Sequence, residues 1–148
     1  GIVGVCCGAY NVIWLGLIDA DISRAQGEGP HALETVQASH PIVKGVVERA
    51  VGRKDRDWKP LPVIRVNGPI LFPKHPDHML MSYDWEHRLG AIVAAPYGRG
   101  RAVAISPHPE FMEHETASSP VQEGELLRVS FLLRNALYWS AGASIPNS

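Results

Sequence analysis

Two short segments of the chain hold the residues best suited to chemistry, and the first contains both cysteines. Gly4-Val5-Cys6-Cys7-Gly8 follows an apolar run typical of a buried strand and precedes residues that favour a helix. A strand that turns sharply into a helix through Gly-x-Cys-x-Gly is the thiol form of a nucleophile elbow, because Gly4 and Gly8 leave room beside the nucleophile. Such a turn would bring the Cys6 sulfur to a helix N-terminus, which favours the thiolate, and aim the backbone N–H of Cys7 at an oxyanion. The alternative is a pair of buried cysteines that only pack at a strand end.

The second segment, Ser106-Pro107-His108-Pro109-Glu110, follows another apolar run and supplies a histidine and a carboxylate. A nucleophilic thiol needs a base within about 2.6–3.2 Å and a carboxylate that orients the base. His108 and Glu110 are close enough in sequence to form such a pair. A lone His-Pro-Glu is also typical of a loop with a solvated histidine, so the hypothesis depends on both segments occurring in this order.

The elements that must position these residues follow from the pattern of apolar and turn-forming residues. In the first part of the chain the pattern predicts a strand at residues 2–5, a helix starting at 9–17, a turn at 27–30 and a short helix ending at residue 50. In the second part it predicts a strand at 63–66, a turn at 67–69 and a helix at 121–139. Residues 91–95 and 102–105 predict two more strands. The two glycines in Tyr97-Gly98-Arg99-Gly100 indicate that these strands form an antiparallel hairpin near residues 91–106.

The order of these motifs resembles the class I glutamine amidotransferase pattern. The segment from Gly4 to Tyr10 is most similar to the elbow of the biotin-protein-ligase N-terminal-like branch, which also has an Asn-Gly-Pro segment and a Tyr-Gly-x-Gly-Arg hairpin before Ser-Pro-His-Pro-Glu. The resemblance implies a flavodoxin-like α/β domain, a three-layer sandwich with a mostly parallel sheet. In that domain Cys6 is the nucleophile, His108 the base and Glu110 the orienting carboxylate.

Further residues are candidates for the pocket beside this triad: Tyr10, Asn67, Gly68 and Tyr83. Tyr10 completes the elbow segment, and Asn67 and Gly68 belong to the Asn-Gly-Pro segment of the resembled branch. Tyr83-Asp84-Trp85, together with His87, could line the mouth of the pocket. The alternative for this segment is a strand end with packed aromatic side chains.

The resemblance also implies strands before the elbow. A doubly wound domain is built from βαβ units of ~30 residues or more, so roughly 60 residues of a front half are expected in addition to this chain. That half would belong to the same protein or to a second chain, or a homodimer would cover the sheet edge that is otherwise exposed. The chain is therefore expected to be the C-terminal segment of the domain.

Composition restricts the class of protein. The 148 residues are 45% hydrophobic and 20% charged with a net charge of -1, which predicts one domain over residues 1–148 and argues against binding to nucleic acid or a membrane surface. No stretch approaches the ~18 apolar residues of a membrane span. The two cysteines are adjacent, which excludes a disulfide framework. These features do not assign a cellular compartment, and the cytoplasm is slightly favoured.

The expected activity is attack on an amide-type bond of a small-molecule or peptide-like substrate, by a thiol-dependent hydrolase or amidotransferase that uses no cofactor. His75 and His78 could bind Zn²⁺ with a carboxylate, but they lie in a proline-broken loop and no metal site is predicted. The alternative function is a ligand-binding or scaffolding domain of the same fold without turnover.

Overall fold

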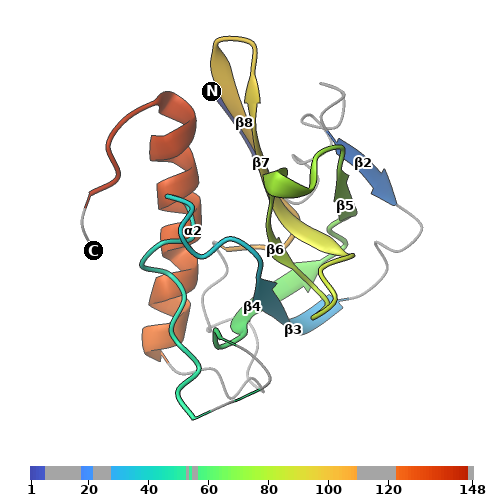
Figure 1. Cartoon of the computed structure of the whole chain (residues 1–148), viewed down its shortest axis with the longest axis vertical. Coiled ribbons are helices and arrows are strands. Elements are labelled where there is room, and N and C mark those ends of the chain that lie inside the picture. The colour runs from blue at the N-terminus through green and yellow to red at the C-terminus, as the bar shows by residue number, and fades with distance from the viewer. Residues whose placement is uncertain (6–17, 22–27, 53, 55–56, 110–122, 147–148) are drawn as a thin grey trace.

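A computed structural model describes residues 1–5, 18–21, 28–52, 54, 57–109 and 123–146 (Figure 1). In this described part the protein is α/β, and a mixed, strongly curled sheet packs against one long helix. The described elements are β1 (Ile2–Val5), β2 (Ile18–Asp21), β3 (Glu28–Thr35), β4 (Leu61–Val66), β5 (Ile70–Pro73), the 3₁₀ helix η2 (Pro76–His78), β6 (Met79–Ser82), β7 (Gly90–Tyr97), β8 (Gly100–Ile105) and α2 (Glu123–Ala141).

The sheet has the strand order β1-β8-β7-β6-β3-β4, and β5 connects β2 to β7 beside this path. Six of the seven pairings between described strands are antiparallel, and only β1 and β8 run parallel. The expectation of a mostly parallel sheet is therefore wrong for the described strands. For two of the six antiparallel pairs the reason is the length of the connection, because a parallel pair needs a crossover of about a dozen residues or more. The links from β6 to β7 and from β7 to β8 are too short for such a crossover.

The expected hairpin is confirmed, since β7 and β8 pair antiparallel from Ile92↔Ile105 to Tyr97↔Gly100. Its two-residue loop is Gly98-Arg99, and Gly98 has a φ of 57°. Glycine at the first central position is the preference of a type II′ turn, whose twist matches the flanking strands. The inner parts of both strands are buried, as their continuous apolar sequences predict.

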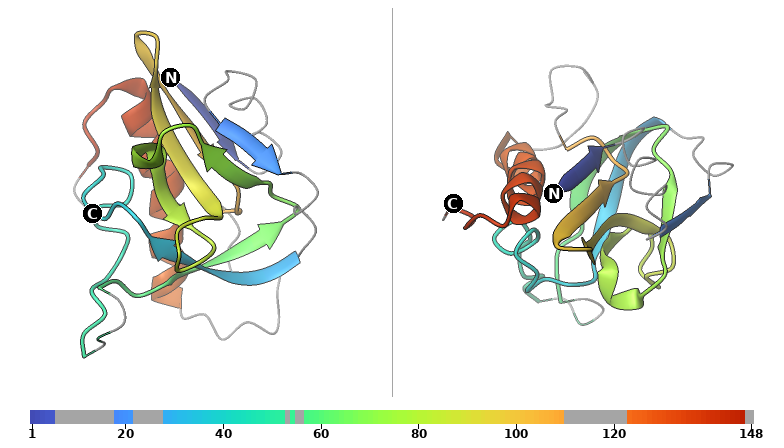
Figure 2. Two further views of the ribbon diagram at one scale, coloured as in Figure 1. Left: turned by 45° about the vertical axis from the view of Figure 1, so that its right-hand side comes forward. Right: turned by 90° about the horizontal axis from the view of Figure 1, so that it is seen from above.

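The helix α2 lies along one side of β1 and β8, as the two views in Figure 2 show. It confirms the helix expected near residues 121–139, and Val129, Leu132 and Ala136 contribute buried side chains to the core. Asn135 is buried on the same helix and donates a hydrogen bond from Nδ2 to the carbonyl of Ile42. This bond satisfies a polar group inside the core and ties the helix to the turns that precede β4.

A residue from the hairpin stabilises the C-terminal end of α2. Arg101 on β8 donates from Nη1 to the carbonyl of Trp139 at 2.8 Å, and its guanidinium lies 5.0 Å from the Trp139 ring centre. The last turn of α2 has no basic residue of its own, so Arg101 supplies the positive charge that a helix C-terminus favours. The His40 ring packs 5.1 Å from Trp139, and burial, with the charge of Arg101 as a second cause, lowers the pKa of His40 to about 4.

Two local expectations are corrected. The segment 27–30 was expected to be a turn, but β3 begins at Glu28 and pairs through Pro30 with Ile64. Proline is tolerated there because β6 pairs only with the end of β3, at Glu34 and Thr35, so the missing N–H removes no ladder bond. The short helix expected before residue 50 is a series of turns, because Gly45 has a φ of 81°, which a helix does not allow.

Candidate functional site

The ends of β1 and β8 lie side by side. These strands are parallel neighbours with the register Gly4↔Ala104 and Val5↔Ile105, so both carboxyl ends meet at the same edge of the sheet. Gly4 is buried in this pairing. Cys6 follows β1 directly in the sequence, and His108 follows the end of β8 by three residues. The two segments that were expected to carry the chemistry thus leave the sheet from adjacent strands.

Half of the expected site falls outside the described residues. These positions are Cys6, Cys7, Gly8, Tyr10 and Glu110. The described candidates are Gly4, Asn67, Gly68, Tyr83 and His108, and each can be located relative to the end of β8.

His108 is fixed to the sheet by its backbone. Its N–H donates to the carbonyl of Ile64 at 2.8 Å, and the two residues form an isolated antiparallel bridge. The side chain is only partly buried. The segment after β8 therefore crosses to β4, which fixes the position of the imidazole without enclosing it.

Ser106 is the first residue after β8 and is completely buried. Its backbone N–H donates to the carbonyl of Ala91, and its hydroxyl lies 2.9 Å from the hydroxyl of Tyr83. Tyr83 follows β6, so this hydrogen bond joins two strand ends that are distant in sequence. It places a phenol beside the segment that leads to His108.

The turn after β4 packs against the same serine. A Cβ atom added to Gly68 would lie 2.1 Å from the Ser106 carbonyl oxygen and 2.6 Å from its Oγ, so only glycine fits at this position. Asn67 precedes it with a φ of 52°, a left-handed conformation that asparagine tolerates better than most residues. The Asn-Gly-Pro segment thus allows this turn to approach Ser106 closely.

Arg65 completes the cluster from inside the sheet. It is 6% exposed, and it donates from Nε and Nη2 to the carbonyl of Gly68 at 3.2 and 2.8 Å. Its guanidinium lies 5.0 Å from the centre of the Tyr83 ring, and His31 meets the same ring edge-on at 5.8 Å. The Arg65 guanidinium thus joins the turn after β4 to the ring of Tyr83.

Gly68, Tyr83, Arg65 and Ser106 together are called the Ser106 cluster below. Two of them, Gly68 and Tyr83, were candidates from the sequence. Arg65 was missed, although the alternation Leu61, Val63, Arg65 puts it on the buried face of the strand. A charged residue at an inward position is the signal that could have revealed it.

A separate cavity of about 600 Å³ lies on another part of the molecule. Its described lining residues are Glu34, Thr35, Val36, Asp57, Trp58, Trp85 and His87. They come from the end of β3, the segment before β4 and the loop between β6 and β7. Trp85 and His87, which were considered for the mouth of the catalytic pocket beside the alternative of packed aromatics at a strand end, line this cavity together with two carboxylates.

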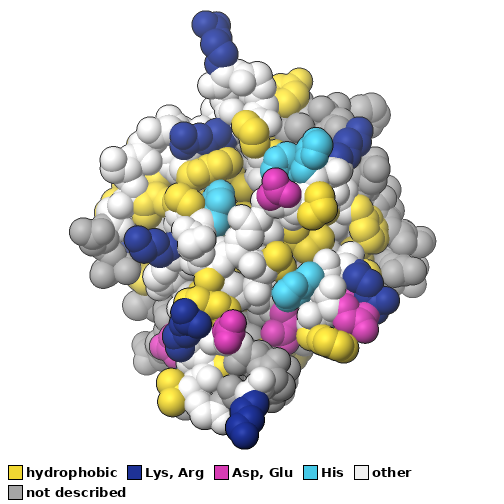
Figure 3. Space-filling view, in the orientation of Figure 1, with side chains coloured by type: hydrophobic (Ala, Val, Ile, Leu, Met, Phe, Trp, Pro, Cys, Tyr) yellow, Lys and Arg dark blue, Asp and Glu magenta, His cyan; other side chains and the backbone are white. Residues whose placement is uncertain are grey.

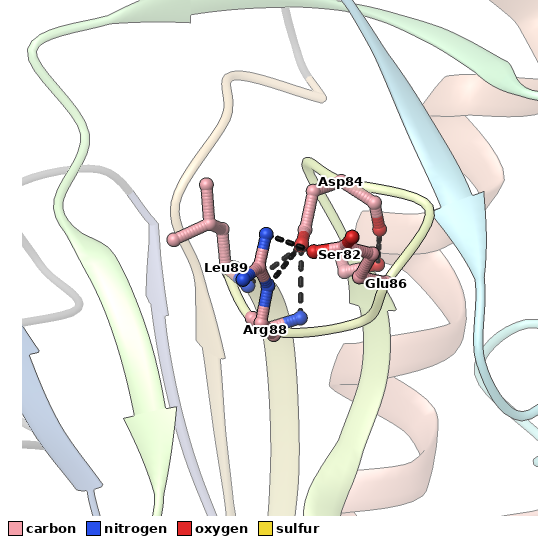
Figure 4. Close-up of polar contacts among 5 residues, drawn as sticks. All are labelled: Ser82, Asp84, Glu86, Arg88 and Leu89. Carbon is pink, nitrogen blue, oxygen red and sulfur yellow. Dashed lines mark hydrogen bonds and ion pairs between the residues drawn. The ribbon is translucent and has the colours of Figure 1, made fainter.

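The loop that carries Trp85 and His87 is held by its own polar contacts (Figure 4). Asp84 accepts hydrogen bonds at Oδ1 from the backbone N–H groups of Arg88 and Leu89, at 2.9 and 2.7 Å. Ser82 donates from Oγ to the Asp84 carbonyl at 2.7 Å, and Arg88 forms ion pairs with Asp84 and Glu86. Such a closed network gives the loop one defined conformation.

The two histidines considered as metal ligands lie close together. The rings of His75 and His78 are 5.2 Å apart, centre to centre, in an edge-on arrangement. Among the residues that the structure describes, no group of three or more His, Cys, Asp or Glu side chains could hold a metal ion.

The described surface shows no concentration of one charge on the face in Figure 3, where Lys and Arg side chains are dispersed among acidic and hydrophobic ones. No helix in the described part of the chain has the length and apolar character required to cross a bilayer. No protein-family model matches the sequence, and no curated protein or solved structure matches it either.

Proposed function

We propose that this chain is a thiol-dependent amide hydrolase or amidotransferase-like domain in which Cys6 is the nucleophile, His108 the base and Glu110 the carboxylate that orients it. The observation that carries the proposal is the parallel pairing of β1 with β8 in the register Val5↔Ile105. In that register the two strands end together, and the segments that contain the cysteine and the histidine start from neighbouring positions.

The proposed reaction has two steps. The Cys6 thiolate attacks the amide carbonyl carbon, the backbone N–H of Cys7 stabilises the oxyanion, and protonated His108 gives its proton to the leaving amine as the C–N bond breaks. A thioester on Cys6 remains. His108 then takes a proton from water, the resulting hydroxide attacks the thioester, and the acid and the Cys6 thiolate are released.

The Ser106 cluster supports this assignment from the side of the base. His108 is bonded through its backbone to Ile64, and Ser106, two residues earlier, is fixed by Tyr83 and by the contact with Gly68. A catalytic base must be held close to one position, because small displacements reduce the rate strongly. The hydrogen bonds and close contacts around residues 106–108 are of the kind that provide such rigidity.

The finer fold assignment is part of the same proposal. We take β1 and β8 as the parallel pair of a flavodoxin-like sheet of the class I glutamine amidotransferase type. Further strands would extend it beyond β1, whose second edge has no partner among the described strands. A front half, a second chain or another copy of this chain would supply them, and an uncovered strand edge is a common site for such pairing.

The test is the reactivity of the two cysteines. An activated Cys6 should react with iodoacetamide at neutral pH much faster than Cys7, as followed by mass spectrometry of the intact protein and of its peptides. Cys6→Ser should abolish the fast reaction and Cys7→Ser should leave it intact. His108→Ala should slow the alkylation of Cys6, because the imidazolium that stabilises the thiolate is lost. Slow and equal alkylation of both cysteines would contradict the proposal.

A second candidate function is ligand binding without turnover. It is favoured by the cavity of about 600 Å³, since none of its described lining residues belongs to the proposed triad. The cysteine experiment separates the two candidates, because a binding domain has no need for an activated thiolate.

A further inference from the structure

The cavity described above is of a size suited to a small ligand, which typically occupies about 300–1,000 Å³. Three separate segments form its described walls: residues 34–36, residues 57–58 and the loop between β6 and β7. Figure 3 shows acidic, basic, histidine and hydrophobic side chains together over that loop. The described walls thus combine two indole rings, a histidine and two carboxylates.

The aromatic part of this surface is exposed to an unusual degree. Trp85 has 73% of its surface accessible, although tryptophan is normally well buried. The hydrogen bonds of Asp84 hold the loop on both sides of Trp85, and His87 has the left-handed φ of 57°. An indole that is exposed on a rigid loop loses little conformational freedom when a ligand covers it, which favours binding.

The second indole already binds a cation within the protein. The guanidinium of Arg49 lies 4.4 Å from the centre of the Trp58 ring, and the two residues form an isolated antiparallel bridge. Arg49 therefore already covers a face of Trp58 as a cation covers an indole, and the exposed ring of Trp85 is left for a ligand.

Two of the described lining residues are acidic. The described walls contain two carboxylates, on Glu34 and Asp57, and no Lys or Arg side chain. The Asp57 side chain is exposed and forms no hydrogen bond or ion pair with a described residue, so it is open to a ligand. Carboxylates next to indole faces attract an organic cation through charge and through the ring quadrupole together.

We infer that this cavity is a binding site for a small organic cation of the quaternary ammonium or alkylated amine class, held between Trp85 and the carboxylate of Asp57. Trp85 would contact the apolar surface of the cation, and Asp57 would balance its charge. The inference does not depend on Cys6, and it holds whether the chain is an enzyme or a binding domain.

A matched pair of probes tests the inference on the full chain. Choline and 3,3-dimethylbutan-1-ol have almost the same shape, but only choline carries a charge. Titration of each, followed by tryptophan fluorescence and by NMR, should show saturable binding of choline that is at least fivefold tighter than that of the neutral alcohol. Equal binding of the two probes, or no saturation by choline at tens of millimolar, would overturn it.

Variants locate the site. Trp85→Leu should weaken choline binding at least fivefold, Trp85→Phe less, and Asp57→Asn about threefold, because each removes part of the attraction. The controls are Tyr97→Leu, an exposed aromatic at the other end of β7, and Asp77→Asn, an exposed carboxylate in η2; both should bind choline like the unmodified chain. Unchanged melting temperatures would show that the Trp85 and Asp57 variants are folded. Binding that survives both Trp85→Leu and Asp57→Asn in folded protein would contradict the assignment.

Discussion

The Ser106 cluster and the tryptophan-lined cavity use polar side chains in opposite ways. In the cluster, Arg65 and Ser106 are buried and bonded, and the Gly68 backbone approaches Ser106 so closely that no side chain would fit. In the cavity, Trp85 and Asp57 are exposed. The polar groups of the cluster bond to other groups of the protein, whereas those of the cavity are exposed and can contact a ligand.

The cluster is thus suited to holding residues in position, and the cavity is suited to binding a ligand. Substitutions in the cluster should change stability and the geometry of the segment that leads to His108, since these groups are bonded inside the fold. Substitutions at the mouth of the cavity should change affinity and leave stability almost unaltered, because exposed side chains contribute little to it.

The largest effect is expected for Gly68→Ala. The added methyl group would overlap the carbonyl oxygen and the hydroxyl of Ser106, so the turn and the end of β8 must move apart. Overpacking of this kind costs about 3 kcal/mol or more when backbone atoms form the obstacle. Urea denaturation should show the loss.

The matched control is Gly100→Ala in the hairpin, where the nearest atom to a new Cβ is the Tyr97 carbonyl oxygen at 3.5 Å. That distance is ordinary contact, and a change below ~1 kcal/mol is expected. Equal losses for the two glycines would show that the close approach of Gly68 to Ser106 is unimportant.

A smaller loss is expected for Tyr83→Phe, which removes the hydroxyl that bonds to Ser106. The cost should be about 1 kcal/mol, because Ser106 keeps a buried hydroxyl without this partner. Thermal unfolding of Tyr83→Phe, Ser106→Ala and the double variant gives the coupling between the two groups. Strictly additive losses would mean that the hydrogen bond contributes nothing of its own.

The sequence predicted local elements better than it predicted the sheet. The apolar run at residues 2–5, the alternation before Asn67, the glycine pair at 98 and 100 and the apolar face of α2 are each readable from neighbouring residues, and each element was found. The strand at residues 2–5 is less buried than expected, since only Gly4 in it is buried. Pairing between distant strands depends on the whole chain. The parallel order expected from the family resemblance did not hold for β3 to β8, whose pairings with one another are all antiparallel. Short connections require this only for β6 with β7 and for β7 with β8.

Contacts between residues distant in sequence also limited the prediction of the candidate site. Gly68 and Tyr83 were proposed as neighbours of one pocket, and the structure brings both to Ser106. Nothing in the spacing of Glu34, Asp57 and Trp85 along the chain indicates that they share a cavity, because β3 and the β6–β7 loop meet only through the fold of the sheet. Cys6 and Glu110 lie outside the described residues, so their roles stay predictions.

The smallest effect is expected at Thr35, in the wall of the cavity, and its sign should be opposite to that of the cluster. The Thr35 hydroxyl oxygen is buried and has no hydrogen-bond partner. Thr35→Val replaces this hydroxyl by a methyl group of similar shape, so the unfolding free energy should stay the same or rise by up to ~1 kcal/mol. Denaturation of Thr35→Val beside Ser106→Ala measures the contrast, because the second substitution removes a hydroxyl that is bonded. A loss of stability in Thr35→Val as large as in Ser106→Ala would mean that the Thr35 hydroxyl is satisfied in solution, and the cavity wall would then resemble the cluster.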